Sequence, residues 1–125
     1  MTISPQCLLS WAENQPKTDE TDYRACISRA YYAAYHDCKR FHDSLPSPGA
    51  GASSGGVHED LCHRLIHTSP ETKKDQQLNE RSQKRVAFLR PLKHKRGIAD
   101  YELNETISLT DAANIIAKAK LIMSI

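Results

Sequence analysis

The sequence lacks most of the features that mark membrane, secreted or strongly nucleic-acid-coating proteins. Among 125 residues there are two Phe, one Trp and four Cys, and the formal net charge is only +2. No run approaches the roughly 18 consecutive apolar residues of a membrane span, and residues 1–14 have no basic start or signal-peptide cleavage site. Such a small charge excess excludes a histone-like or ribosomal-tail protein. We expect a soluble, cytoplasmic protein that forms one domain over residues 1–125.

The four cysteines fit no common metal or redox motif. They are Cys7, Cys26, Cys38 and Cys62. No two of them form a CxxC pair, which excludes a zinc ribbon or a thioredoxin-like site. His58 and Cys62 share a helical face at a spacing of four, but a third zinc ligand would have to come from elsewhere. The Gly-rich residues 49–56 lack the Lys-Ser/Thr end of a P-loop. We expect reduced, mostly buried thiols, no bound metal and no cofactor.

Apolar residues recur at spacings of three and four, and no stretch alternates as a strand does, so the sequence predicts an all-α protein. Ser4 followed by Pro5 predicts the start of a short helix that ends before Pro16. A long helix is expected over residues 18–44, with one apolar stripe: Tyr23, Ile27, Ala30, Ala34, Cys38, Phe41 and Leu45. Residues 46–56, rich in Gly, Ser and Pro, are expected to form a mobile connection.

Three further helices are expected in the second half of the chain. One short helix covers residues 57–66, and a long one begins at Ser69-Pro70, with a kink or break near residues 88–90 caused by Pro91. Ser108 and Asp111 predict a capping box at the start of the last helix. Together these helices predict an up-and-down bundle of three to four main helices with short additions. Because large apolar residues are few, we expect a homodimer.

Positive charge is concentrated in residues 73–96, which hold nine Lys or Arg against two acids. Such a block on a helix either binds phosphates or forms a solvated face. Only Phe88 is aromatic within it, so base stacking is a weak expectation and phosphate contacts would dominate binding to RNA. The candidate phosphate-binding residues are Arg85, Arg90, Lys93, His94, Lys95 and Arg96.

Arg29 and His36 are seven residues apart, which places them within about 20° of each other on one helical face. An arginine that holds a phosphate and a histidine that moves a proton suffice for metal-free RNA cleavage, because the 2′-hydroxyl is the nucleophile. The alternative is that both side chains pair with acids such as Asp22 or Asp37. These spacings alone leave both interpretations open.

Arg96, Asp100 and Tyr101 form a second compact polar group, in the segment HKRGIADYEL. It is a candidate functional motif. The alternative is structural, with an Arg–Asp pair closing a helix end and the tyrosine covering the core.

Residues 28–36, SRAYYAAYH, closely resemble the motif of HEPN domains, and residues 96–101, RGIADY, resemble a second element of that family. The resemblance implies a commonly dimeric helical bundle of toxin–antitoxin or antiphage systems, often encoded beside a minimal nucleotidyltransferase. Many members are metal-independent endoribonucleases that use Arg, four to six residues and then His, in a cleft between two subunits. Arg29 and His36 match that spacing, although toxin members usually carry it later, where HKRGIADY lies here.

The resemblance therefore predicts an endoribonuclease, the toxin or effector of such a system, with Arg29 and His36 as catalytic residues. Its expected partners are RNA, a second copy of the chain and a cognate antitoxin or nucleotidyltransferase, with Tyr101 a position for AMP addition. The alternative is a non-catalytic HEPN module that binds RNA, a nucleotide or a partner protein.

Overall fold

The computed structural model describes residues 2–46 and 55–125, and within these ranges it contains six helices and no strand. The prediction of an all-α protein is confirmed. The expected mobile connection over residues 46–56 falls almost wholly outside the described residues. The helices are α1 (Pro5–Asn14), α2 (Glu20–Asp43), α3 (Gly56–Ile66), α4 (Pro70–Lys74), α5 (Gln76–Tyr101) and α6 (Leu109–Met123).

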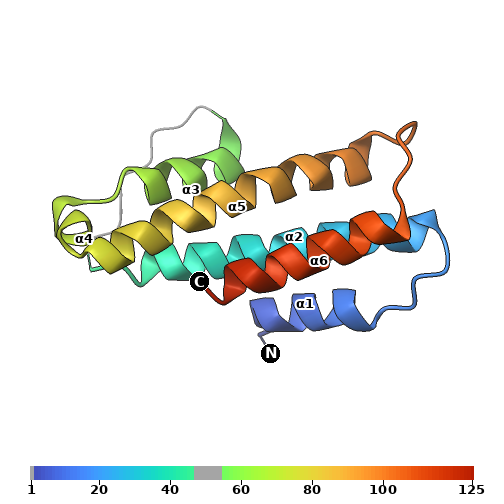
Figure 1. Ribbon diagram of the computed structural model, residues 1–125, viewed down its shortest axis with the longest axis horizontal. Helices are drawn as coiled ribbons and strands as arrows, with labels where there is room; N and C mark the ends of the chain where they lie inside the picture. Colours follow the sequence, from blue (N-terminus) through green and yellow to red (C-terminus); the bar gives the residue numbers. More distant parts are fainter. Residues whose placement is uncertain (1, 47–54) are drawn as a thin grey trace.

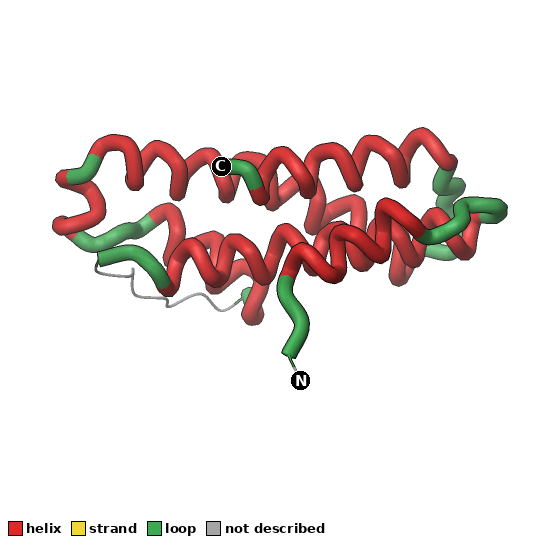
Figure 2. Tube along the Cα trace, turned by 90° about the horizontal axis from the view of Figure 1, so that it is seen from below, coloured by secondary structure: helices red, strands yellow, loops and turns green. Residues whose placement is uncertain are grey.

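Helix α2 lies in the middle of the molecule, and α1, α5 and α6 each pack along it (Figure 1). α1 and α5 run opposite to α2, whereas α6 runs in the same direction (Figure 1). The short helix α3 packs mainly on α5 and touches α2. The tube view in Figure 2 shows the long helices lying side by side, with the connections gathered at the two ends.

The predicted starts of α1 and α6 are confirmed at the level of single hydrogen bonds. The Ser4 hydroxyl accepts from the backbone N–H of Cys7 at 3.3 Å, with Pro5 at the first helical position. Ser108 and Asp111 form a reciprocal capping box, with bonds of 2.9 and 3.1 Å. These bonds satisfy backbone donors that have no partner within the helix.

Of the two outcomes expected near Pro91, a kink or a break, the break is absent because α5 is continuous there, and the helix boundary lies instead at Asp75. α4 ends at Lys74, and the Asp75 carboxylate accepts from the N–H of Leu78 at 3.2 Å to start α5. α5 then continues through Pro91 to Tyr101. Proline removes one helical hydrogen bond, to the carbonyl four residues earlier. Pro91 and Ala87 are both exposed, so water can satisfy that carbonyl and the helix tolerates the loss.

The core is built from small residues of α2 and branched residues of the surrounding helices. In the predicted stripe, Tyr23 is partly buried, while the other members are buried: Ile27, Ala30, Ala34, Cys38, Phe41 and Leu45. Leu89 and Leu92 of α5 pack against this cluster, and so does Ile122 of α6. All four cysteines are free thiols, and all but Cys7 are buried.

Arg24 fixes the end of α5 against α2. Its guanidinium donates to the carbonyls of Ile98 and Ala99, at 3.2 and 3.0 Å, and to the carbonyls of Glu102 and Glu105. These contacts reach carbonyls at and just beyond the C-terminus of α5, where positive charge is favourable. Arg24 thereby sets the position of the Arg96–Tyr101 segment relative to α2.

Candidate functional site

Arg29 and His36 both lie on the exposed edge of α2. Neither forms a hydrogen bond or an ion pair with another described residue. The acids considered as partners are occupied elsewhere, since Asp22 accepts from Thr18 and Asp37 accepts from Arg85. The two side chains are therefore available to a ligand, about 10 Å apart along the helix axis.

The surroundings of His36 favour its neutral form. Its ring packs edge-on against Tyr35, at 5.1 Å between centroids, and near Tyr32 at 6.3 Å. Partial burial lowers the pKa of His36, and the positive charges of Lys39 and Arg40 lower it further. At pH 7 the imidazole is then largely unprotonated and able to accept a proton.

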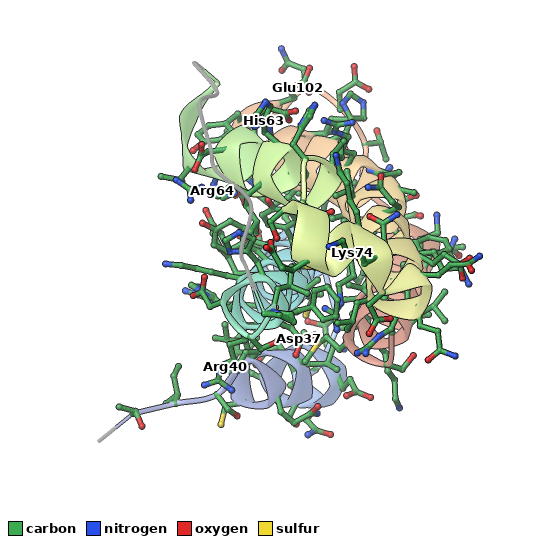
Figure 3. All side chains as sticks on the ribbon, turned by 90° about the vertical axis from the view of Figure 1, so that its left-hand side faces the viewer. Asp37, Arg40, His63, Arg64, Lys74 and Glu102 are labelled. Carbon is green, nitrogen blue, oxygen red and sulfur yellow. The ribbon has the colours of Figure 1, made fainter. Side chains whose placement is uncertain are left out.

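Lys39 and Arg40 also line a hollow of about 250 Å³ between the start of α1 and α2. His36 is part of its wall, and the apolar surface comes from α1 and the residues just before it. The lining residues are Ile3, Ser4, Pro5, Leu8, His36, Lys39, Arg40 and Asp43. Arg40 lies at the edge of α2 beside α1, on the flank away from α6 (Figure 3). These two cations were missed from sequence because they lie outside the basic block; the signal was a Lys-Arg pair one turn after His36.

On the other side of His36, His58 of α3 packs into a group of tyrosines. Its Nδ1 atom is 2.8 Å from the Tyr31 hydroxyl, and its ring is 4.9 Å from that of Tyr35. Partial burial lowers the pKa of His58, with further lowering by Arg96, Lys93 and His36. Within residues 2–46 and 55–125, no three His, Cys, Asp or Glu side chains gather as metal ligands would.

The basic residues of α5 divide into different groups. Arg90 and Lys93 reach Glu59 of α3, at 2.6 and 3.6 Å. Together with His94 and Arg96 they line an open hollow of about 620 Å³, which also includes Glu59, Gly97, Tyr101 and Glu102. The hollow thus brings together four of the six predicted phosphate-binding residues, and cations in such a concave surface attract phosphates.

Arg85 and Lys95 do not share this surface. Arg85 is buried, 2.7 Å from Asp37 and over the ring of Phe41 at 4.4 Å. Its charge is used inside the protein, so the prediction that it binds surface phosphates is corrected. Lys95 lies on another face of α5, where its ammonium is 3.3 Å from Asp111.

Arg96, Asp100 and Tyr101 do form one group, and it joins α5 to α2. The Arg96 guanidinium is 3.5 Å from Asp100 and lies over three tyrosine rings at 5.3 to 5.8 Å: Tyr31, Tyr32 and Tyr101. Ser28 donates to the same Asp100 carboxylate at 3.3 Å. Tyr101 is 77% exposed, so it does not cover the core as the structural alternative expected.

Comparisons of the chain with models of protein families, with curated proteins and with solved structures found no match. In the part of the chain that the structure describes, no helix combines the length and the apolar run needed to cross a membrane. The site itself therefore carries the functional argument.

Proposed function

We propose that this protein is a metal-independent endoribonuclease in which Arg29 holds the scissile phosphate and His36 moves a proton. One observation carries the proposal: an exposed imidazole with a lowered pKa shares a helical edge with a guanidinium that pairs with no side chain in the described part of the chain. A neutral histidine can take the proton of the 2′-hydroxyl. A cation that contacts the phosphate stabilises the charge that develops on it.

The cations on both sides of His36 support RNA as the substrate. Lys39 and Arg40 line the hollow beside α1, and Arg90, Lys93 and Arg96 line the hollow beside α3. A strand that crosses α2 at His36 would meet positive charge before and after the scissile bond. Phosphate contacts of this kind supply most of the affinity in sequence-independent binding.

The resemblance of SRAYYAAYH to HEPN domains supports the same proposal and extends it. We propose an up-and-down bundle that works as a cytoplasmic homodimer, with the Arg29–His36 edges of two copies facing one cleft. In this setting the protein is the toxin or effector of a toxin–antitoxin or antiphage system. A cognate antitoxin or nucleotidyltransferase is its proposed partner.

The test is RNA cleavage with a chelator present, for wild type, Arg29→Ala and His36→Ala. Loss of the proton-transfer group lowers kcat by about 100-fold or more, because general acid–base catalysis contributes about 10²–10⁴-fold. Loss of the arginine lowers kcat/KM and also lowers kcat, because the charge that develops on the phosphate loses its stabilising cation. His67→Ala, an exposed histidine at the end of α3, is the matched control and retains wild-type rates. Equal cleavage by all four proteins contradicts the proposal.

The second candidate is a non-catalytic module that binds RNA, a nucleotide or a partner protein. It is favoured by the open hollow that the exposed Tyr101 helps to line, which needs no proton transfer to bind a ligand. This alternative predicts binding of labelled RNA, measured by fluorescence anisotropy, without turnover and without dependence on His36.

A further inference from the structure

His58 is held in a defined orientation beside the edge of α2. Its ring packs on Tyr32 and Tyr35 at 5.9 and 4.9 Å, and its Nδ1 atom bonds to the Tyr31 hydroxyl at 2.8 Å. The residue is partly exposed, and its Nε2 atom makes no hydrogen bond with a described residue. One ring nitrogen is thus anchored while the other is left for a ligand.

His58 and His36 lie close to each other, because both pack on the same two tyrosines. Their ring centroids are 4.9 and 5.1 Å from the centroid of Tyr35, which bounds their separation at the sum of the two, about 10 Å. A proton on His36 lowers the pKa of His58, so their charges are also coupled. Two imidazoles at such a separation can approach one phosphodiester from opposite sides.

RNA cleavage through the 2′-hydroxyl needs two proton transfers. One group must accept the 2′-hydroxyl proton while another donates a proton to the leaving 5′-oxygen. His36 alone can accept the first proton but cannot donate the second in the same step. A second proton-transfer group within reach of the same phosphate is therefore required for a fast reaction.

We propose that His58 is this second group, the general acid of the reaction in which His36 is the base. The inference rests on the proposed nuclease function. His36 takes the proton from the 2′-hydroxyl, the 2′-oxygen bonds to phosphorus, the bond from phosphorus to the 5′-oxygen breaks, and protonated His58 gives its Nε2 proton to that oxygen. The products are a 2′,3′-cyclic phosphate and a 5′-hydroxyl, and exchange with water restores both histidines.

The neighbours of His58 suit an acid. The Tyr31 hydroxyl is fully buried, and burial raises the pKa of Tyr31 well above its usual range, so it stays a neutral partner that accepts from protonated Nδ1. Partial burial lowers the pKa of His58, and Arg96 and Lys93 from α5 and His36 from α2 lower it further, so its imidazole is largely neutral at pH 7 without a ligand and its protonated form is the stronger acid. The bound phosphodiester supplies the negative charge that favours protonation.

Two substrates separate a general acid from a structural residue. In uridylyl-3′,5′-adenosine the leaving alkoxide needs a proton, whereas in uridine 3′-(4-nitrophenyl phosphate) the leaving phenolate does not. We expect His58→Asn to slow cleavage of the first by about 100-fold or more, and of the second by less than about 10-fold. His36→Ala should slow cleavage of both substrates, because both need the general base. His67→Ala should slow cleavage of neither. Asparagine at position 58 keeps a polar partner for the Tyr31 hydroxyl. Circular dichroism checks that the variant is folded.

A second variant keeps the test independent of that substitution. Tyr31→Phe retains the imidazole but removes its anchor, so it should slow only cleavage of the dinucleotide. If His58→Asn slows cleavage of both substrates equally, or slows neither, the assignment of His58 as the general acid is overturned. The assignment of His36 is then unaffected. Wild-type protein that cleaves neither substrate overturns the proposed nuclease and this inference with it.

Discussion

Arg85 of α5 and Asp37 of α2 form an ion pair of 2.7 Å, with side chains that are 5% and 24% exposed. The same guanidinium lies 4.4 Å from the centre of the Phe41 ring, and it contacts the sulfur of Cys38 at 3.6 Å. A charge removed from water needs partners of this kind. The ion pair therefore ties α5 to α2 and withdraws one cation of the basic block from the surface.

Replacing Arg85 should affect stability and leave RNA binding unchanged. Arg85→Met leaves Asp37 without its partner, and because that carboxylate is partly exposed we expect a loss of about 2–3 kcal/mol, below the range for fully buried pairs. Urea unfolding measures the loss. Lys84→Met, next in sequence and exposed, should stay within about 0.5 kcal/mol of wild type. Weaker RNA binding at unchanged stability would place Arg85 on the phosphate surface after all.

The four thiols should differ sharply in reactivity. A hydrogen bond with Ser4 lowers the pKa of Cys7, which is exposed, whereas burial raises the pKa of Cys38 to about 11 and also raises those of Cys26 and Cys62. Because the thiolate is the reactive form, one thiol should react quickly with Ellman's reagent at pH 7.5 in native protein, and all four in urea. Cys7→Ser should remove the fast phase. A second fast thiol in the folded protein contradicts this assignment.

The hollow beside α3 should control the salt dependence of RNA binding. Removing one cation that binds a phosphate lowers the slope of log K against log salt by about 0.7 for a single strand. We expect Lys93→Gln to lower the slope, and Arg90→Gln to do so as well. Glu59→Gln should strengthen binding, since it frees both cations from the carboxylate that now pairs with them. Unchanged affinity and slope in all three variants would place the RNA elsewhere.

Stability should fall on mild acidification because of His36 and His58. Both have a lowered pKa in the folded protein, so below their unfolded value of 6.5 the unfolded chain binds more protons and is favoured. The free energy of unfolding should be flat above pH 7 and decrease from about pH 6.5 towards pH 5. Over that interval His58→Gln should show a smaller decrease in urea unfolding. The same decrease in wild type and variant would show that His58 does not contribute to it.

The helices were predictable from sequence where the signals are local. Ser4-Pro5 and the Ser108–Asp111 pair set helix starts through bonds within one turn, and the structure contains those bonds. Of the kink or break predicted at Pro91, the break is wrong, because the cost of proline in a helix depends on whether the freed carbonyl meets water, which only the packing decides. Asp75, whose carboxylate starts α5, was not recognised as a cap.

The candidate site was predictable only in part, since helical phase does not reveal which face of a helix packs. Arg85 and Arg90 belong to the same basic block, yet one is buried against Asp37 and the other lines the open hollow. Lys39 and Arg40 line a hollow that forms only because the start of α1 packs beside α2, which the spacing of residues in α2 does not predict. His58 and His36 are 22 residues apart in sequence, and only the packing of α3 near α2 brings them together.

The measurement that tests the central claim most directly is the chemistry of the RNA ends produced with a chelator present. Purified protein is incubated with a labelled single-stranded RNA, and the products of wild type and His36→Ala are compared. The account predicts products with 2′,3′-cyclic phosphate and 5′-hydroxyl ends from wild type, and about 100-fold slower cleavage by the variant. Intact RNA with wild type, or equal cleavage by the variant, would contradict it.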